Sequence, residues 1–274
     1  MESIYAHPCF IIHMAKHPER EDVYRRIVEA GFSQVQWFDA VDGNHLPTLH
    51  KCLARLKLPR LDHSITSGAL GCLLSHLSLL EKIIQEQIPI TTIFEDDVVF
   101  HPEWSHLAEK YLALTPSYEV LFIGNQLDSC RMSSTPGPEI TQESVYCTHS
   151  YVVTLEGAKK LFYHLTTWDS ERTPYTGLTM IDYMIKNIQV ESNKNSIPKP
   201  FVWYSWNGTS YPCEQNPLPI RFEHCRNTGL VFQDTRLPTT IQNSERVHLE
   251  PCYNLPNSTR KVRKPMSFLK TGSS

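Results

Sequence analysis

The sequence predicts an α/β protein with a mostly parallel central sheet flanked by helices. Short apolar runs rich in β-branched residues alternate with segments of helical periodicity, and the first three elements come in the order strand, helix, strand. That order favours parallel pairing, because the helix carries the chain back to the edge from which the first strand started. With 274 residues, of which 41% are hydrophobic and 20% charged, the chain is long enough for one elaborated globular domain.

The first third of the chain supplies this strand, helix, strand unit. Residues 9–15 form a short apolar run that is typical of a buried strand. Residues 17–32 carry Val23 and Ile27 at helical spacing, which predicts an amphipathic helix. Residues 35–41 then predict the second strand.

Residues 67–86 give the clearest helical pattern in the chain. Their apolar stripe recurs every three or four residues, at Leu70, Leu73, Leu77, Leu80 and Ile84. Ser67 is placed to cap the first turn of this helix. After Pro89 the run up to residue 94 is rich in β-branched residues, so we predict a third strand that is buried on both faces.

The second half continues the alternation. The pattern predicts helices over residues 101–114, 155–165 and 178–188, and strands over residues 119–124 and 145–154. Thr154 is placed to cap the helix that follows it. Residues 125–144 carry Pro, Gly, Ser and Thr with little periodicity, which predicts a mobile flap.

Composition and charge argue against several classes of protein. A formal net charge of −3 provides no basic field for nucleic-acid phosphates, so we expect no nucleic-acid partner. No run approaches ~18 consecutive apolar residues, and the first residues do not resemble a signal peptide, so the expected location is cytoplasmic. The eight cysteines lack a C-x-x-C pair and are expected to be reduced. The sequons at Asn207 and Asn257 would then be unused.

Three consecutive acids, Glu95, Asp96 and Asp97, directly follow the third predicted strand. In α/β sheets ligands bind beyond the carboxyl ends of the strands, so these carboxylates are expected to face a ligand there. Mg²⁺ and Mn²⁺ prefer oxygen ligands, and one or two carboxylates with diphosphate oxygens complete their shell. Such a cation assists a departing diphosphate. The alternative is that the acids cap a following helix or turn.

At this point the sequence resembles glycosyltransferase family 25, which includes bacterial lipooligosaccharide galactosyltransferases and collagen-modifying transferases. Five segments carry the resemblance in the same order, and they cover roughly the first two thirds of the chain: CFIIHMAKHPER, QWFDAVDG, SGALGCLLSH, IFEDDVVF and THSYVVTLEGAKKL. The resemblance implies a GT-A type nucleotide-binding fold, a sugar-nucleotide donor that is commonly a UDP-hexose, and inversion at the anomeric carbon. It also implies that His13 and Arg20 lie near the nucleotide, where Arg20 would hold phosphate; the alternative for Arg20 is a surface position.

The resemblance and the residue types together suggest roles for the remaining candidates. We expect Glu95 and Asp96 on the donor, Asp97 and Asp96 on the metal, and His224 or His248 as a third metal ligand. Gly68 would allow backbone to approach the donor, or would only aid packing.

Inverting transfer needs a base for the acceptor hydroxyl. Asp182 is the candidate because it interrupts an apolar helical turn and matches an acid of the family; the alternative is an ordinary acid at a helix start. His76 is assigned to the catalytic group as a supporting or acceptor-side residue, against the alternative of a structural histidine. Clustered aromatics at Trp203, Tyr204, Trp206 and Tyr211 would stack on an acceptor sugar or belong to the core.

We therefore predict a metal-dependent inverting transferase that moves galactose or glucose from a UDP-sugar to a glycan, glycolipid or protein hydroxyl, for example in lipopolysaccharide biosynthesis. Residues 1–200 would form the GT-A-like catalytic domain, 201–259 an elaboration on the acceptor side, and 260–274 a flexible basic tail. That tail either contacts an anionic membrane or only aids solubility. The alternatives are a non-catalytic sugar-nucleotide or glycan-binding module, and a metal-dependent nucleotidyltransferase or hydrolase, although no Gly-rich phosphate loop is present.

Overall fold

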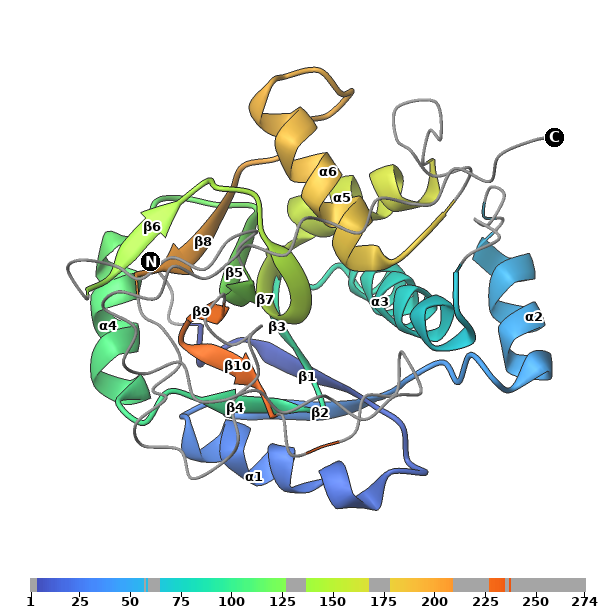
Figure 1. Cartoon of the computed structure of the whole chain (residues 1–274), viewed down its shortest axis with the longest axis horizontal. Helices are drawn as coiled ribbons and strands as arrows, with labels where there is room; N and C mark the ends of the chain where they lie inside the picture. The colour runs from blue at the N-terminus through green and yellow to red at the C-terminus, as the bar shows by residue number, and fades with distance from the viewer. Residues whose placement is uncertain are drawn as a thin grey trace, which may run out of the picture.

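The computed structural model describes residues 4–56, 58, 65–126, 137–167, 178–208, 227–234 and 237. At its centre is an eight-stranded sheet in the order β2-β1-β3-β7-β5-β8-β6, with β9 paired to β5 (Figure 1). These strands are β1 (Pro8–His13), β2 (Gln34–Asp39), β3 (Ile90–Glu95), β5 (Val120–Gln126), β6 (Glu139–Thr141), β7 (Tyr146–Thr154), β8 (Trp203–Asn207) and β9 (Asn227–Gly229). A separate two-stranded ribbon joins β4 (Val98–Phe100) to β10 (Val231–Gln233).

Most strands of the large sheet run in one direction. β1 pairs in parallel with β2 and β3, and β5 pairs in parallel with β8. β7 is antiparallel to both β3 and β5, so these two share the direction of β1. The predicted class, an α/β domain with a mostly parallel central sheet, is therefore confirmed. Because β7 runs the opposite way, its first residues lie beside the carboxyl end of β3.

Helices cover both faces of the sheet. They are α1 (Asp22–Glu29), which follows a 3₁₀ turn over Pro18–Arg20, and α2 (Leu46–Leu56), α3 (Ser67–Gln85), α4 (Trp104–Leu114), α5 (Leu155–Thr166) and α6 (Ile181–Asn193). α3, α5 and α6 lie together on one side in Figure 1, and α1 and α4 lie on the other. Two apolar cores follow from this arrangement. One contains Ile93 of β3 and packs under α3, and the other contains Phe94 and packs under α1.

The helix starts agree with the sequence in one case and differ in another. Thr154 caps α5 as predicted, because its hydroxyl accepts a hydrogen bond from the amide of Gly157 at 3.1 Å. The prediction that Ser67 caps α3 was wrong. Thr66 caps that helix instead, accepting from the amide of Ala69 at 3.2 Å, because Ser67 already lies inside the first turn.

The loop after β2 is fastened to α3. The Ser75 hydroxyl donates to the carbonyl of Gly71 at 2.7 Å and accepts from the amide of Val41 at 2.8 Å. A Cβ atom at Gly71 would lie 2.6 Å from the carbonyl oxygen of Val41, so Gly71 is required for this close packing. The Asp42 carboxylate accepts from the amide of Asn44 at 3.0 Å and so holds the turn that follows β2.

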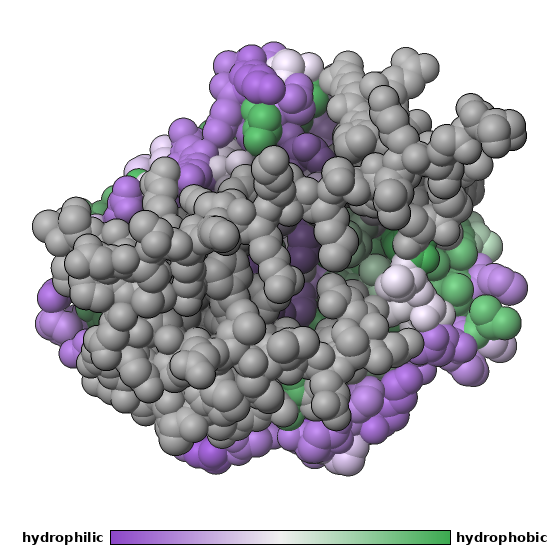
Figure 2. Space-filling view, viewed as in Figure 1, coloured by the Kyte–Doolittle hydropathy of each residue, from purple (hydrophilic) through white to green (hydrophobic). Residues whose placement is uncertain are grey.

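Within the described residues, α3 is long and apolar enough to cross a membrane by length and composition alone, at a mean hydropathy of 1.2. This is weak evidence for a span, because 61% of that window is buried inside the protein, as expected of a core helix. The outer surface near α1 is hydrophilic, as the lower edge of Figure 2 shows.

Several predicted features of the second half need correction. Asn125 belongs to β5 and residues 139–141 form β6, so the predicted flap is shorter; residues 127–136 lie outside the described part of the chain. Trp203 and Trp206 are fully buried, one in each core, because residues three apart on β8 face opposite sides. They therefore offer no stacking face to an acceptor. Tyr211 lies outside the described residues.

The domain division at residue 200 stays a prediction, although β8 lies beyond it and belongs to the main sheet. The basic tail of residues 260–274 is outside the described part. Among the described cysteines, Cys9, Cys52, Cys72 and Cys147 are free thiols. Asn207 is buried and its amide donates to the hydroxyl of Ser205 at 3.1 Å, so the folded chain presents no acceptor at that sequon.

Candidate active site

The acidic triplet lies where the sequence placed it, at the carboxyl end of β3. Glu95 is the last residue of the strand, and Asp96 and Asp97 form the turn that leads into β4. Side chains alternate across a strand, so Glu95 points to the same face as Ile93, under α3. The three neighbouring acids therefore enter different surroundings.

The Asp96 carboxylate is enclosed by the side chains of Arg20 and His13, an arrangement that we call the Asp96 cage. One of its carboxylate oxygens accepts from the Arg20 guanidinium at 2.5 Å, and the other lies 2.9 Å from His13 Nδ1. All three residues are buried. Burial lowers the pKa of Arg20, but the negative charges of Asp96 and Asp97 raise it by more than burial lowers it. The net shift is therefore upward, and the guanidinium stays charged. The alternative of a surface position for Arg20 is wrong.

Glu95 has a different set of partners, on α3 and β7. Its Oε1 accepts from the Thr148 hydroxyl at 2.8 Å and lies 3.2 Å from His76 Nε2. Burial raises the pKa of Glu95, but the hydrogen bonds and positive charge of His76 and the bond from Thr148 outweigh it and lower the pKa to about 2. Glu95 is therefore a carboxylate at neutral pH.

His76 is fixed at both ring nitrogens. Its Nδ1 lies 3.1 Å from the hydroxyl of Tyr151, and the two rings stack with centroids 5.8 Å apart. Gly68, Cys72 and His76 are spaced four residues apart and so lie along one face of α3, with His76 next to Glu95 of β3. The structure therefore places His76 at the acidic end of β3. Gly68 lies about two helical turns before His76 on α3.

Asp182 completes this cluster from the first turn of α6. Its Oδ1 lies 3.4 Å from the Thr148 hydroxyl, so Thr148 stands between Asp182 and Glu95. Burial and the negative charge of Glu95 raise the pKa of Asp182 to about 6. A half-buried carboxyl whose pKa lies near neutral can exchange a proton with a bound hydroxyl.

Two contributors to the cluster were absent from the candidates taken from sequence. Thr148 could not be chosen because the antiparallel pairing of β7 with β3, which places it beside Glu95, has no local signal. Cys72 did have a local signal in the sequence, because it precedes His76 by one helical turn. The candidate metal ligand His224, and its alternative His248, lie outside the described residues.

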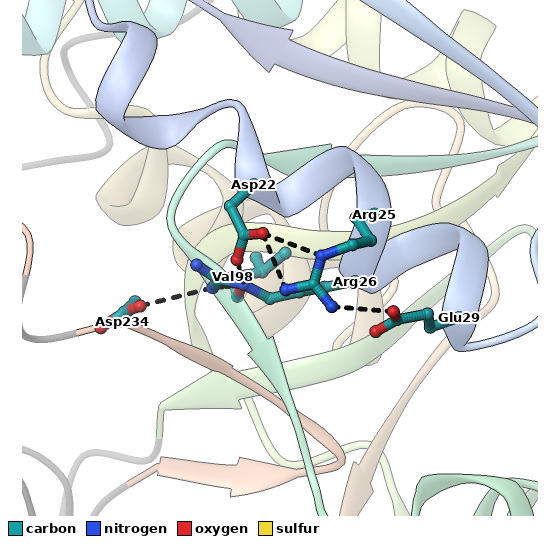
Figure 3. A network of polar contacts seen from close by, with 6 residues as sticks. All are labelled: Asp22, Arg25, Arg26, Glu29, Val98 and Asp234. Atoms are coloured by element: carbon teal, nitrogen blue, oxygen red, sulfur yellow. Dashed lines mark hydrogen bonds and ion pairs between the residues drawn. The ribbon is translucent and has the colours of Figure 1, made fainter.

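The acidic turn is also held from the C-terminal side. β10 pairs antiparallel with β4, and the amide of Asp234 donates to the carbonyl oxygen of Asp97. Figure 3 shows Arg26 of α1 reaching the same place. Its guanidinium donates to the carbonyl oxygen of Val98 at 2.9 Å and lies 3.3 Å from the Asp234 carboxylate. Its Nε pairs with Asp22 on its own helix.

A comparison with known proteins places this site in a family. Residues 6–185 match the model described as glycosyltransferase family 25 (LPS biosynthesis protein). The chain belongs to glycosyltransferase family 25. The matched segment contains the acidic triplet, His76, Thr148 and Asp182, so the cluster described above lies within the family domain.

Among curated relatives, the inactive glycosyltransferase 25 family member 3 of Mus musculus is 30% identical over 166 residues, and procollagen galactosyltransferase 2 of Homo sapiens is 26% identical over 166 residues. Each alignment covers 56% of this chain but only 28% and 26% of the relative, so the chain spans about a quarter of their length. A solved glycosyltransferase involved in glycosylation of the major capsid of PBCV-1 is 13% identical, with a TM-score of 0.39, over 83% of this chain and 92% of that one.

Proposed function

We propose that this family 25 chain is a metal-dependent inverting transferase that moves galactose or glucose from a UDP-sugar to a hydroxyl of a glycan, glycolipid or protein. The observation that carries the proposal is Asp182, with a pKa of about 6, next to Glu95 and Thr148 at the carboxyl end of β3. The human relative is a procollagen galactosyltransferase by name, which supports galactose as the sugar.

The residues present fit a hard divalent cation at Asp97 better than at Asp96. Both oxygens of Asp96 already contact Arg20 or His13, and a cation there would lie beside a guanidinium. Asp97 follows the strand end, and Mg²⁺ or Mn²⁺ needs only one or two carboxylates when diphosphate oxygens supply the rest. When bound, such a cation neutralises charge on the departing UDP. Of the two proposed metal ligands, we therefore favour Asp97.

The chain's own residues divide the remaining work. The acceptor hydroxyl attacks the anomeric carbon from the side opposite the departing diphosphate, which gives inversion, and Asp182 accepts the proton of that hydroxyl. Glu95 stays ionised and keeps the pKa of Asp182 high enough for that proton. His76 holds Glu95 in place and is a positioning residue.

The deciding experiment follows release of UDP from UDP-galactose and UDP-glucose with Mn²⁺, with and without a panel of glycan, glycolipid and peptide acceptors. We expect release that requires both cation and acceptor, and its loss with EDTA. Asp182→Asn should lose most of this release, because its amide cannot accept the hydroxyl proton. Glu156→Gln is the matched control, because Glu156 is also an acid in a first helical turn but is exposed.

Two other outcomes would replace the proposal. Donor binding without UDP release under any condition would favour a non-catalytic sugar-nucleotide-binding module, which is relevant because the mouse relative is named inactive. Release of free hexose at the same rate without acceptor would favour a hydrolase.

A further inference from the structure

A second group of possible metal ligands lies on the α3 side of the acidic triplet and includes its first member, Glu95. Cys72 and His76 come from α3 and Glu95 from the end of β3, and one ligand atom from each lies within 4.8 Å of the other two. This group differs in kind from the Asp97 site, because it includes a sulfur and an imidazole nitrogen. The transferase proposal uses neither of these as a ligand.

The framework of the group is rigid. Residues four apart on a helix lie one above the other, so Cys72 and His76 present their side chains in the same direction. α3 is a 19-residue helix packed into the core, and His76 is completely buried. A site built on such a helix changes little when an ion binds.

The second nitrogen of His76 supports a ligand role for the first. Metal-binding histidines generally hold their other ring nitrogen in a hydrogen bond, which fixes the ring and its tautomer. Here Tyr151 contacts Nδ1 at 3.1 Å, and Nε2 faces Glu95. Tyr151 would therefore orient the ligand from β7.

The charge around the group favours a cation. Glu95, a member of the group, and Asp182 of α6 both contact the Thr148 hydroxyl, so two carboxylates lie close together here. A divalent ion bound by one thiolate and one carboxylate forms a neutral unit, which removes the cost of burying these charges alone.

From this arrangement we propose that Cys72, His76 and Glu95 bind Zn²⁺. A thiolate, an imidazole and a carboxylate are the three ligand types that Zn²⁺ takes in proteins, and hard Mg²⁺ has little preference for sulfur. On binding, the S–H bond of Cys72 breaks, a Zn–S bond forms and the proton passes to solvent. Three protein ligands leave a fourth tetrahedral position for water.

The test uses Co²⁺ as a spectroscopic substitute for Zn²⁺ on the full chain, without an affinity tag and after removal of metals. We expect an equimolar thiolate-to-cobalt charge-transfer band in the near ultraviolet that one equivalent of Zn²⁺ removes. Cys72→Ser should abolish the band, and Tyr151→Phe should weaken Zn²⁺ binding about 10–100-fold. Cys52→Ser is the control, because Cys52 is a half-buried free thiol on α2 outside the group.

Other results would overturn the proposal. The absence of a charge-transfer band in the parent chain, or a band that persists in Cys72→Ser, would remove Cys72 as a ligand. If Cys72→Ser does not fold, alkylation of the parent chain decides, since bound Zn²⁺ should slow modification of Cys72 at least tenfold and leave Cys52 unaffected. Equal rates with and without Zn²⁺ would exclude the site. None of these measurements depends on transferase activity, so the two proposals can fail separately.

Discussion

Glu95 and Asp96 are neighbours in the chain, but their surroundings differ in charge balance. Asp96 has a buried guanidinium on one oxygen and an imidazole on the other, so its charge is compensated within the cage. On the α3 side, the imidazole of His76 lies beside Glu95 and also acts on Asp182, and His149 adds a smaller interaction with Glu95. The first arrangement compensates its carboxylate with a guanidinium, whereas the second pairs two acids chiefly with an imidazole, so that a proton or a metal ion can supply further positive charge.

The largest expected effect is on the rate of transfer, and it concerns the cluster of Glu95 and Asp182. Asp182→Asn should slow transfer ~10²–10⁴-fold with donor affinity nearly unchanged, because an amide cannot accept the hydroxyl proton. Asp97→Asn should instead weaken Mn²⁺-dependent donor binding, as measured by calorimetry. Near-normal turnover in Asp182→Asn would remove it as the base.

The second largest expected effect is on the free energy of unfolding, and it concerns the buried ion pair between Arg20 and Asp96. Arg20→Ala should lower the free energy of unfolding by ~3–5 kcal/mol, because it leaves the Asp96 carboxylate buried without its main counter-charge. Denaturant unfolding measures this directly. Arg25→Ala is the control, since Arg25 makes only exposed ion pairs on α1, and we expect little change there. Equal effects of the two substitutions would mean that Asp96 is compensated in some other way.

A smaller effect concerns how the contribution of Asp182 to stability changes with pH. The pKa of Asp182 is raised in the folded chain, so its proton stabilises the fold below pH 4 and that contribution is lost as the pH rises through about 6. In metal-free buffer at pH 8, Asp182→Asn should therefore be more stable than the parent, on the order of 1–3 kcal/mol. The gain should shrink towards pH 5. A gain that does not change with pH would contradict the raised pKa.

The smallest effect concerns the hydroxyl that stands between the two carboxylates. The Thr148 hydrogen bond lowers the pKa of Asp182, so Thr148→Val should move the acidic limb of the pH–rate profile to higher pH, by about one unit or less. Thr141→Val is a suitable control, because Thr141 is on β6 and contacts Ser205 instead. A limb that stays in place would show that Thr148 does not act on Asp182.

Local patterns were sufficient for the main strands and helices, because apolar periodicity and β-branched runs report directly which face is buried. They left α2 without a prediction, although Leu49, Leu53 and Leu56 recur there at helical spacing. For the site, the acids and His76 were found from sequence. Their division into two charge environments was not, since it depends on which strands pair with β3.

The aromatic segment after residue 200 illustrates the same limit. Trp203 and Trp206 look alike in sequence as sugar-stacking or core residues, and only the pairing of β8 with β5 places them in the two cores. Thr148 depended on strand direction in the same way. Long-range pairing decides such assignments, and a single sequence carries little information about it.

The attachment of Asp234 to the carbonyl of Asp97 has a consequence for when the site is completed during synthesis. β1, β3 and α3 can associate early, but the turn that carries Asp97 gains its β10 partner only after residues 231–234 have been made. At ~5–20 residues per second, that interval lasts several seconds or more. Over this time the nascent chain holds an acidic turn without its final support, so the site is assembled after most of the sheet beneath it.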